Sequence, residues 1–164
     1  MAVLRWLVRI AAVLVALIAL VFFGARFHDG PLGPIPGGPL AAGELVAEPV
    51  ADWSFVKDTG EIELQLDSQN RSRITWIFFL DGKAYVPCSL GFPPGKNWHQ
   101  HAAQDGRATL RIDGKRYPVT LTKLDDAVVQ QMGDTVRAEL TRKYGELPAT
   151  EAGVWVFEVT SRAS

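Results

Sequence analysis

The sequence predicts a mainly β (α+β) fold, a compact β-barrel with one or two flanking helices, preceded by a single transmembrane helix. Three observations predict it. Two Asp-Gly pairs, Asp81-Gly82 and Asp113-Gly114, each join runs rich in β-branched and aromatic residues, a strong hairpin signal. One amphipathic run follows the second pair, and an apolar stretch lies near the N-terminus. Many short strands with few helices favour a β-barrel.

The N-terminal apolar stretch has the length of a membrane-spanning helix. From Val3 to Phe23 only Arg5 and Arg9 interrupt it. A bilayer core about 30 Å thick needs ~20 helical residues, and these two arginines can reach the head groups from the helix start. A cleaved signal peptide is the alternative, but cleavage after Ala25 would leave Phe23 where small residues are preferred. We therefore favour an uncleaved anchor.

The residues that flank this stretch indicate its orientation. Two arginines precede it, whereas Arg26, His28 and Asp29 follow it. This weak positive-inside bias places the N-terminus in the cytoplasm. We expect a single-pass protein of the cytoplasmic (inner) membrane that contacts lipid through residues 3–23, with its C-terminal domain outside the cytoplasm.

The chain is expected to have three parts: the anchor (1–26), a linker (27–39) and one domain (40–164). The linker contains GPLGPIPGG, from Gly30 to Gly38. Proline and glycine disfavour both helix and ladder hydrogen bonds, so this segment is expected to be a spacer. The rest of the chain is about the size of one domain.

Short runs in the domain are predicted to be strands. Tight turns at the two Asp-Gly pairs would place Phe78 opposite Tyr85 and Leu110 opposite Tyr117. Pro118 cannot donate a ladder hydrogen bond and predicts an edge strand or a bulge. The predicted strands are Trp53–Val56, Glu61–Leu66, Arg73–Leu80, Lys83–Cys88, Arg107–Ile112, Lys115–Lys123 and Val154–Val159.

One amphipathic helix is predicted over residues 125–144. Apolar side chains recur there at a spacing of four, with Asp125 or Asp126 as the N-cap and Gly145 as the stop. The buried stripe would consist of Val128, Met132, Val136, Leu140 and Tyr144.

Two histidines close together raise the question of a metal site. On a strand His99 and His101 would share a face and could chelate a metal, whereas on a helix they would point about 200° apart. The surrounding KNWHQHAAQ favours a helix. We therefore expect two polar surface histidines and no metal site.

Composition excludes several functions. All 18 acidic residues lie beyond the apolar stretch, so the domain is mildly acidic. Nucleic-acid binding normally needs a clustered basic face, so no nucleic-acid partner is expected. Cys88 is the only cysteine, which rules out an intrachain disulfide and suggests a buried or site-lining thiol. No nucleophile elbow, phosphate-binding glycine loop or paired-cysteine motif occurs, so no catalytic residue is assigned.

Candidate ligand-binding residues lie on one predicted strand. Arg73 and Thr75 share a strand face whose other residues are apolar, and such a pair could hold a phosphate or carboxylate. The alternative, favoured from the residues alone, is that Arg73 forms a surface ion pair at the exposed end of the strand.

A second group follows in the loop SLGFPPGKNW, from Ser89 to Trp98. Lys96 precedes a predicted helix start, where an anion could bind, although an ordinary surface loop fits equally well. Trp98 and Phe92 could stack on a planar ring, but packing in the core is the more frequent role of such side chains.

The order of these segments resembles the split β-barrel superfamily of pyridoxamine-phosphate-oxidase-like flavoproteins, most closely its deazaflavin-dependent nitroreductase branch. The stretches that carry the resemblance are NRSRITW, the first Asp-Gly hairpin, SLGFPPGKNWHQHAAQDG, RATLRIDGKRYPVTL and the final KYG-to-WVFEV segment. The resemblance implies a split β-barrel, a homodimer, and flavin mononucleotide (FMN) or a deazaflavin as cofactor. It also implies contacts to the cofactor from Arg73, Thr75, Ser89, Lys96 and Trp98.

The leading hypothesis is therefore a membrane-tethered flavin- or deazaflavin-binding protein, an oxidoreductase for quinone-like or nitro-aromatic substrates. In such proteins the cofactor supplies the redox chemistry and the protein supplies binding and orientation. The alternative is a cofactor-free split barrel that serves as an extracytoplasmic ligand-binding or interaction module.

Overall fold

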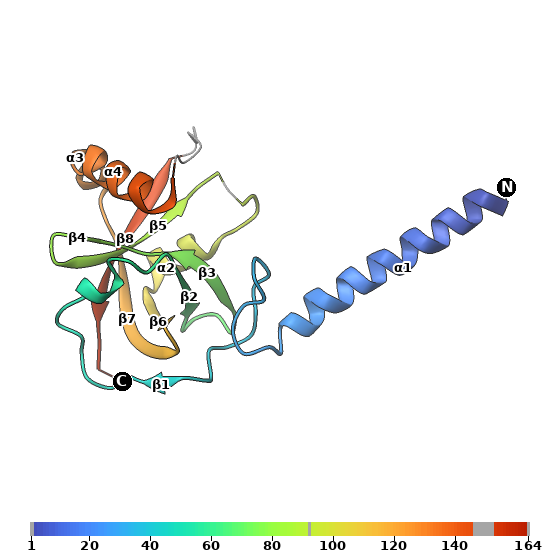
Figure 1. Ribbon diagram of the computed structural model, residues 1–164, viewed down its shortest axis with the longest axis horizontal. Coiled ribbons are helices and arrows are strands. Elements are labelled where there is room, and N and C mark those ends of the chain that lie inside the picture. Colours follow the sequence, from blue (N-terminus) through green and yellow to red (C-terminus); the bar gives the residue numbers. More distant parts are fainter. Residues whose placement is uncertain (1, 92, 146–152, 164) are drawn as a thin grey trace.

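A long N-terminal helix projects from a curled β-sheet (Figure 1). The computed structural model describes residues 2–91, 93–145 and 153–163. In helix α1 (Ala2–Ala25) every side chain from Val3 to Phe23 is exposed. Within the described residues, α1 is the one helix that is long and apolar enough to cross a membrane.

The sheet has the strand order β3-β2-β6-β7-β8-β5-β4, and the neighbours in this order are antiparallel. A short strand, β1, pairs in parallel with β7. The strands are β1 (Glu44–Leu45), β2 (Glu61–Leu66), β3 (Ser72–Trp76), β4 (Phe78–Leu80), β5 (Lys83–Ser89), β6 (Arg107–Ile112), β7 (Lys115–Lys123) and β8 (Val154–Ser161).

The sheet curls because β3 and β4, at opposite ends of the strand order, are consecutive in the chain. They meet at Ile77, which is fully buried. The Ile77 N–H donates to the Tyr144 hydroxyl (3.1 Å), and the Ile77 carbonyl accepts from Lys143 Nζ (2.9 Å). At the bend, these hydrogen bonds to side chains take the place of backbone hydrogen bonds to a neighbouring strand. The prediction of one strand over Arg73–Leu80 is therefore wrong at this residue, whereas the mainly β, curled half-barrel fold class is confirmed.

Both predicted hairpins are present. At Asp81-Gly82 the φ values are 50° and 83°, and at Asp113-Gly114 they are 48° and 76°. Two consecutive positive φ values are what a two-residue hairpin turn requires. The predicted pairs are confirmed: Phe78 with Tyr85, and Leu110 with Tyr117.

Pro118 lies in a strand with partners on both sides, so the prediction of an edge or a bulge is wrong. Its carbonyl accepts from the Arg162 N–H (3.0 Å), which shows that its backbone polar groups face away from β6. On that side β1 pairs with Lys115 and Arg116, and β8 pairs from Val119 onward. Pro118 falls between these two stretches, so its missing N–H interrupts no ladder.

The helices differ from prediction in two places. Residues 53–56 form a 3-10 turn (η1, Ser54–Val56) instead of a strand. Trp53 and Val56 are both buried while Phe55 is exposed, a spacing of three that suits a helical turn and not strand alternation. The predicted long helix is two, α3 (Asp126–Gln131) and α4 (Gly133–Tyr144), which are separated at Met132, where φ is −81° and ψ is −5°.

Two hydrophobic clusters hold these elements together. The larger fills the inside of the curled sheet and includes side chains from the short helix α2 (Trp98–Gln104), which was predicted as a helix. The smaller lies on the outer face of β4, β5 and β8, beneath α4, and consists of Phe78, Tyr85, Val136, Leu140 and Val156. The helices therefore cover opposite faces of the sheet.

The segment after α1 is folded against the domain. Leu32 and Ile35 exchange backbone hydrogen bonds, and Gly37 exchanges them with Ser72 at the start of β3. The expectation that proline and glycine would leave residues 30–38 without ladder bonds is therefore wrong. The hydrogen bonds between Leu32 and Ile35, and between Gly37 and Ser72, satisfy backbone groups of this segment.

Candidate functional site

The residues expected to bind a ligand come from three elements that meet at one corner of the barrel. Arg73 and Thr75 lie on β3 and pair with Leu64 and Ile62 of β2, whose side chains are in the inner core. They therefore share the inner face of the sheet. The remaining candidates lie at the end of β5 and at the start of α2: Ser89, Lys96 and Trp98.

Arg73 lies partly inside this corner. Its guanidinium carbon is 5.9 Å from the centre of the Trp98 ring, and its Nη2 donates to Gln69 Oε1 (2.6 Å). It forms no ion pair within the part of the chain that the structure describes. Burial, together with the nearby charge of Arg71, lowers the pKa of Arg73 to about 10. The surface ion pair that the sequence favoured is therefore wrong.

Three buried polar atoms have no hydrogen-bond partner among the described residues: Arg73 Nε, Ser89 Oγ and His99 Nδ1. Nearly all buried polar groups in proteins are hydrogen-bonded, so each exception calls for an explanation. Arg73 lies on the inner face of β3 and His99 on the buried face of α2, whereas Ser89 alternates with the inner-facing Cys88 and therefore lies on the other face of the sheet. The Arg73 Nε donor, on the inner face, is suited to binding a small anionic group.

His99 was predicted as a surface residue, and the structure corrects this, since His99 is only 7% exposed. Its ring meets Trp155 edge-on at 5.0 Å between centroids. Burial lowers the pKa of His99, and the positive charge of Lys96 lowers it further, which favours the neutral ring. The sequence carried a hint of this position, because Trp98, His99 and Ala102 together form the buried face of α2.

The two histidines do not form a metal site with their neighbours. They lie on α2 as predicted, where i and i+2 side chains diverge. Among the described residues, no three histidine, cysteine, aspartate or glutamate side chains gather closely enough to hold a metal ion.

Trp98 lies in the core and does not present a free ring face. It is 5% exposed and packs against Phe157, with 5.6 Å between ring centroids. Trp98 therefore packs in the core, which is the more frequent role of such side chains. Phe92, the other aromatic residue considered for stacking, lies outside the described residues.

Cys88 is buried, as expected, and lies within the electrostatic reach of two cations of the corner. Burial raises the pKa of its thiol to about 11, while Lys96 and Arg73 act in the opposite direction. The folded protein therefore holds this proton to higher pH than the unfolded chain does. Stability should consequently fall as the pH rises from 9.0 toward 11.

Cys88 is expected to resist alkylation in the native protein. The thiolate is the nucleophile, and it is scarce at mildly alkaline pH when the thiol pKa is about 11. Iodoacetamide should leave the folded protein unmodified and should modify it after unfolding in guanidinium, as followed by intact mass. Gln100→Cys, on the exposed side of α2, provides a control that reacts in both states. Rapid modification of the native wild-type protein would contradict the burial of Cys88.

A hollow on the described surface lies elsewhere. It is shallow, has a volume of about 280 Å³, and is lined by Glu61, Glu63, Ile74, Arg111 and Asp113 among others. Ile74 alternates with Arg73 and Thr75 along β3, so this hollow opens on the outer face of the sheet. Arg73 Nε, on the inner face, therefore does not line this hollow.

Comparison with solved structures yields three matching chains. The chain is similar to a solved NimC/NimA family protein from Clostridium acetobutylicum, with 15% sequence identity, a TM-score of 0.40, and coverage of 65% of this chain and 76% of that one. No protein-family model and no curated protein matches the chain.

Proposed function

We propose that this chain is a membrane-anchored protein whose split-barrel domain binds an anionic cofactor of the FMN or deazaflavin type where β3, β5 and α2 meet. The observation that carries the proposal is the partly buried Arg73, whose Nε has no hydrogen-bond partner among the described residues. The resemblance in segment order adds the class of cofactor.

The corner suits a phosphate group. A guanidinium N–H donates well to phosphate oxygens. A buried donor that stays unsatisfied costs ~1–3 kcal/mol, so an anion that accepts from Arg73 would remove a penalty that the free protein carries. Lys96 adds positive charge beside the same corner, as its effects on Cys88 and His99 show.

The ring of the cofactor would lie above this corner and not against Trp98, which is buried in the core. Trp98 instead supports Arg73 from below, through the cation–π contact. Thr75, further along the same strand face, is partly exposed and would lie on the ring side of the site. A bound flavin or deazaflavin would supply hydride transfer, and these residues would bind and orient it.

The proposed activity is reduction of a quinone-like or nitro-aromatic substrate. A membrane location would give such a domain access to quinone-like molecules dissolved in the bilayer. The anchor would be α1, with the domain outside the cytoplasm, as the flanking charges favour. A homodimer is proposed from the family resemblance.

The alternative is a cofactor-free extracytoplasmic module that binds a ligand or another protein. Two observations favour it. Trp98 offers no free ring face to a planar cofactor, and the described hollow lies on the outer face of the sheet, away from Arg73.

Ligand titration separates the two proposals. The full chain in detergent micelles is titrated with FMN and with a deazaflavin, and binding is followed by fluorescence anisotropy. Arg73→Ala should weaken binding by roughly tenfold or more, the effect of losing a charge-assisted hydrogen bond. Arg107→Ala, which removes an exposed partner of Asp105 on β6, is the matched control and should bind normally.

Two results would contradict the proposal in different ways. If the wild-type protein binds neither cofactor at micromolar concentrations, the cofactor reading fails and the ligand-binding module remains. If it binds one of them and Arg73→Ala binds equally well, the cofactor lies elsewhere on the domain and this site assignment fails.

A further inference from the structure

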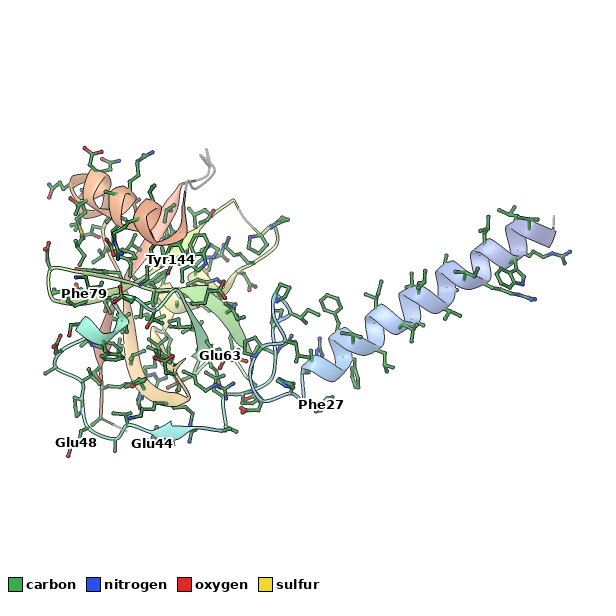
Figure 2. All side chains as sticks on the ribbon, in the orientation of Figure 1. Phe27, Glu44, Glu48, Glu63, Phe79 and Tyr144 are labelled. Carbon is green, nitrogen blue, oxygen red and sulfur yellow. The ribbon has the colours of Figure 1, made fainter. Side chains whose placement is uncertain are left out.

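The apolar surface of α1 continues past the end of the helix. Phe27 is 77% exposed, and its ring packs edge-on against Phe23 in the last turn of α1, with 5.4 Å between centroids. Figure 2 shows Phe27 at the domain end of α1, away from the sheet. Such an exposed aromatic residue at the end of an apolar helix is typical of the membrane interface.

A tight turn beside this helix end presents further apolar groups. Leu32 and Ile35 exchange backbone hydrogen bonds of 3.0 and 3.1 Å, which places Gly33 and Pro34 at the tip. Gly33 has a φ of +56°, the left-handed conformation that favours glycine. Leu32 and Pro34 are both exposed. Figure 1 shows the turn between the end of α1 and the sheet.

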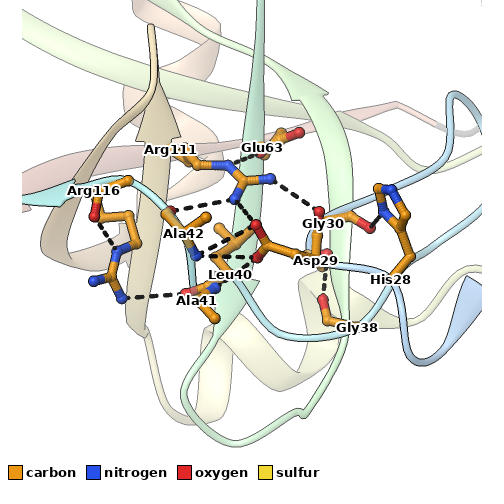
Figure 3. A network of polar contacts seen from close by, with 12 residues as sticks. His28, Asp29, Gly30, Gly38, Leu40, Ala41, Ala42, Glu63, Arg111 and Arg116 are labelled. Atoms are coloured by element: carbon orange, nitrogen blue, oxygen red, sulfur yellow. Dashed lines mark hydrogen bonds and ion pairs between the residues drawn. The ribbon is translucent and has the colours of Figure 1, made fainter.

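An ionic clamp fastens this segment to the domain (Figure 3). The Asp29 carboxylate accepts from the Ala41 N–H (2.7 Å) and from Arg111 Nη1 (2.8 Å). Arg111, on β6, also pairs with Glu63 on β2, and its side chain is only 14% exposed. A partly buried arginine held by two carboxylates is much less free to move than a surface pair.

A second set of contacts holds the segment against the start of β3. The Ser72 hydroxyl donates to the Gly38 carbonyl (2.5 Å), and Arg71 donates to the carbonyls of Pro36 (2.6 Å) and Gly37 (3.0 Å). Gly37 lies so close to Gly30 that an added Cβ would be 1.7 Å from the Gly30 carbonyl oxygen. The backbone is therefore packed on both sides, which leaves little room for the segment to swing.

We propose that Phe27, Leu32 and Pro34 form a lipid-contacting surface that rests on the same bilayer that α1 spans. The surface is continuous with α1 through the contact between Phe23 and Phe27. Exposed Arg26 and His28 lie beside it, at the level where lipid phosphates would be found. Because the clamp of Asp29, Arg111 and Glu63 joins this surface to the sheet, the domain is docked on the membrane in one orientation and does not swing on a loose tether.

This inference rests on the proposed membrane anchoring and is independent of any cofactor. Spin labels test it in the full chain, reconstituted into phosphatidylcholine–phosphatidylglycerol vesicles, with Cys88 replaced by alanine. Single cysteines are placed at Leu32 in the turn, at Val13 within α1, and at Ala127 on α3, which lies on the far side of the domain from α1 (Figure 1). Frequent collisions of a spin label with oxygen show that the label lies in lipid. Frequent collisions with a water-soluble nickel complex show that it lies in water.

The expected result is loss of nickel collisions and gain of oxygen collisions at Leu32, as at Val13, while Ala127 stays accessible to nickel. A Leu32 label as accessible to nickel as the Ala127 label, with the Val13 label in lipid, would overturn the docking but leave the anchor intact. A Val13 label accessible to nickel would overturn the anchor and the docking together.

The clamp is tested in the same assay. Asp29→Ala should make the Leu32 label more mobile and more accessible to nickel, since the turn loses its attachment to Arg111. Asp105→Ala, which removes the exposed carboxylate partner of Arg107, is the matched control and should leave the label unchanged. A Leu32 label that stays immobile and shielded in Asp29→Ala would overturn the assignment of the clamp.

Discussion

Gly106→Ala is expected to destabilise the domain severely. A Cβ at this position would be 1.9 Å from the carbonyl oxygen of Leu121, and the Leu121 N–H donates to the Gly106 carbonyl at 2.8 Å. The clashing atom belongs to the backbone of β7, which pairs on both sides and cannot move without disturbing both ladders. Overpacking against a rigid neighbour costs ~1–3 kcal/mol and sometimes more, and we expect about 3 kcal/mol here.

The measurement is thermal unfolding of the full chain in detergent micelles, followed by near-ultraviolet circular dichroism. Gly133→Ala is the matched control, because an added Cβ there has no neighbour within 4 Å and φ is not positive. At the start of α4 this change should be neutral or stabilise the protein by up to about 1 kcal/mol. Equal melting temperatures for the two variants would show that β6 and β7 separate readily next to Gly106.

Phe157→Ala is expected to destabilise the domain by ~3–5 kcal/mol, the usual cost of emptying an aromatic position in a core. Phe157 is 0% exposed and packs against Trp98 and Trp155, with ring centroids 5.6 and 6.4 Å away. Denaturant titration of the same samples measures the change. Because Trp98 lies under Arg73, this variant should also weaken binding at the proposed site.

Phe55→Ala is the control for Phe157→Ala. Phe55 is exposed and loses only partial stacking on Trp53 and Tyr117, so a loss below about 1 kcal/mol is expected. Similar losses in the two phenylalanine variants would contradict the division between the inner core and the surface of η1.

The parts of the fold that depend on residues close together in the sequence could be predicted. Each Asp-Gly turn determines its own hairpin, because few residue pairs accept two positive φ values, and the register follows from the turn. The alternation of Ile62, Leu64 and Leu66 marked the inner face of β2 for the same local reason. Gly145, with a φ of 77°, ends α4 as expected.

The break at Ile77 could not be predicted in this way. Residues 76–80 form a continuous apolar run, and nothing local distinguishes Ile77 from its neighbours. Its backbone groups instead bond to Tyr144 and Lys143, more than sixty positions along the chain. Pro118 is a similar case. It lies between the part of β7 that pairs with β1 and the part that pairs with β8, and the residues around it do not reveal where those two distant strands pair.

The sequence by itself therefore determined the apolar helix, the two hairpins and the mainly β class, since each rests on residue types a few positions apart. The candidate site was only partly accessible: Arg73, Ser89, Lys96 and Trp98 were named, but His99 was placed on the surface. Only the tertiary structure decided which polar atoms are buried without partners, and that the linker is fastened to the sheet through Asp29 and Arg111. Both depend on packing between segments far apart in the chain, and local patterns do not encode the distance between such segments.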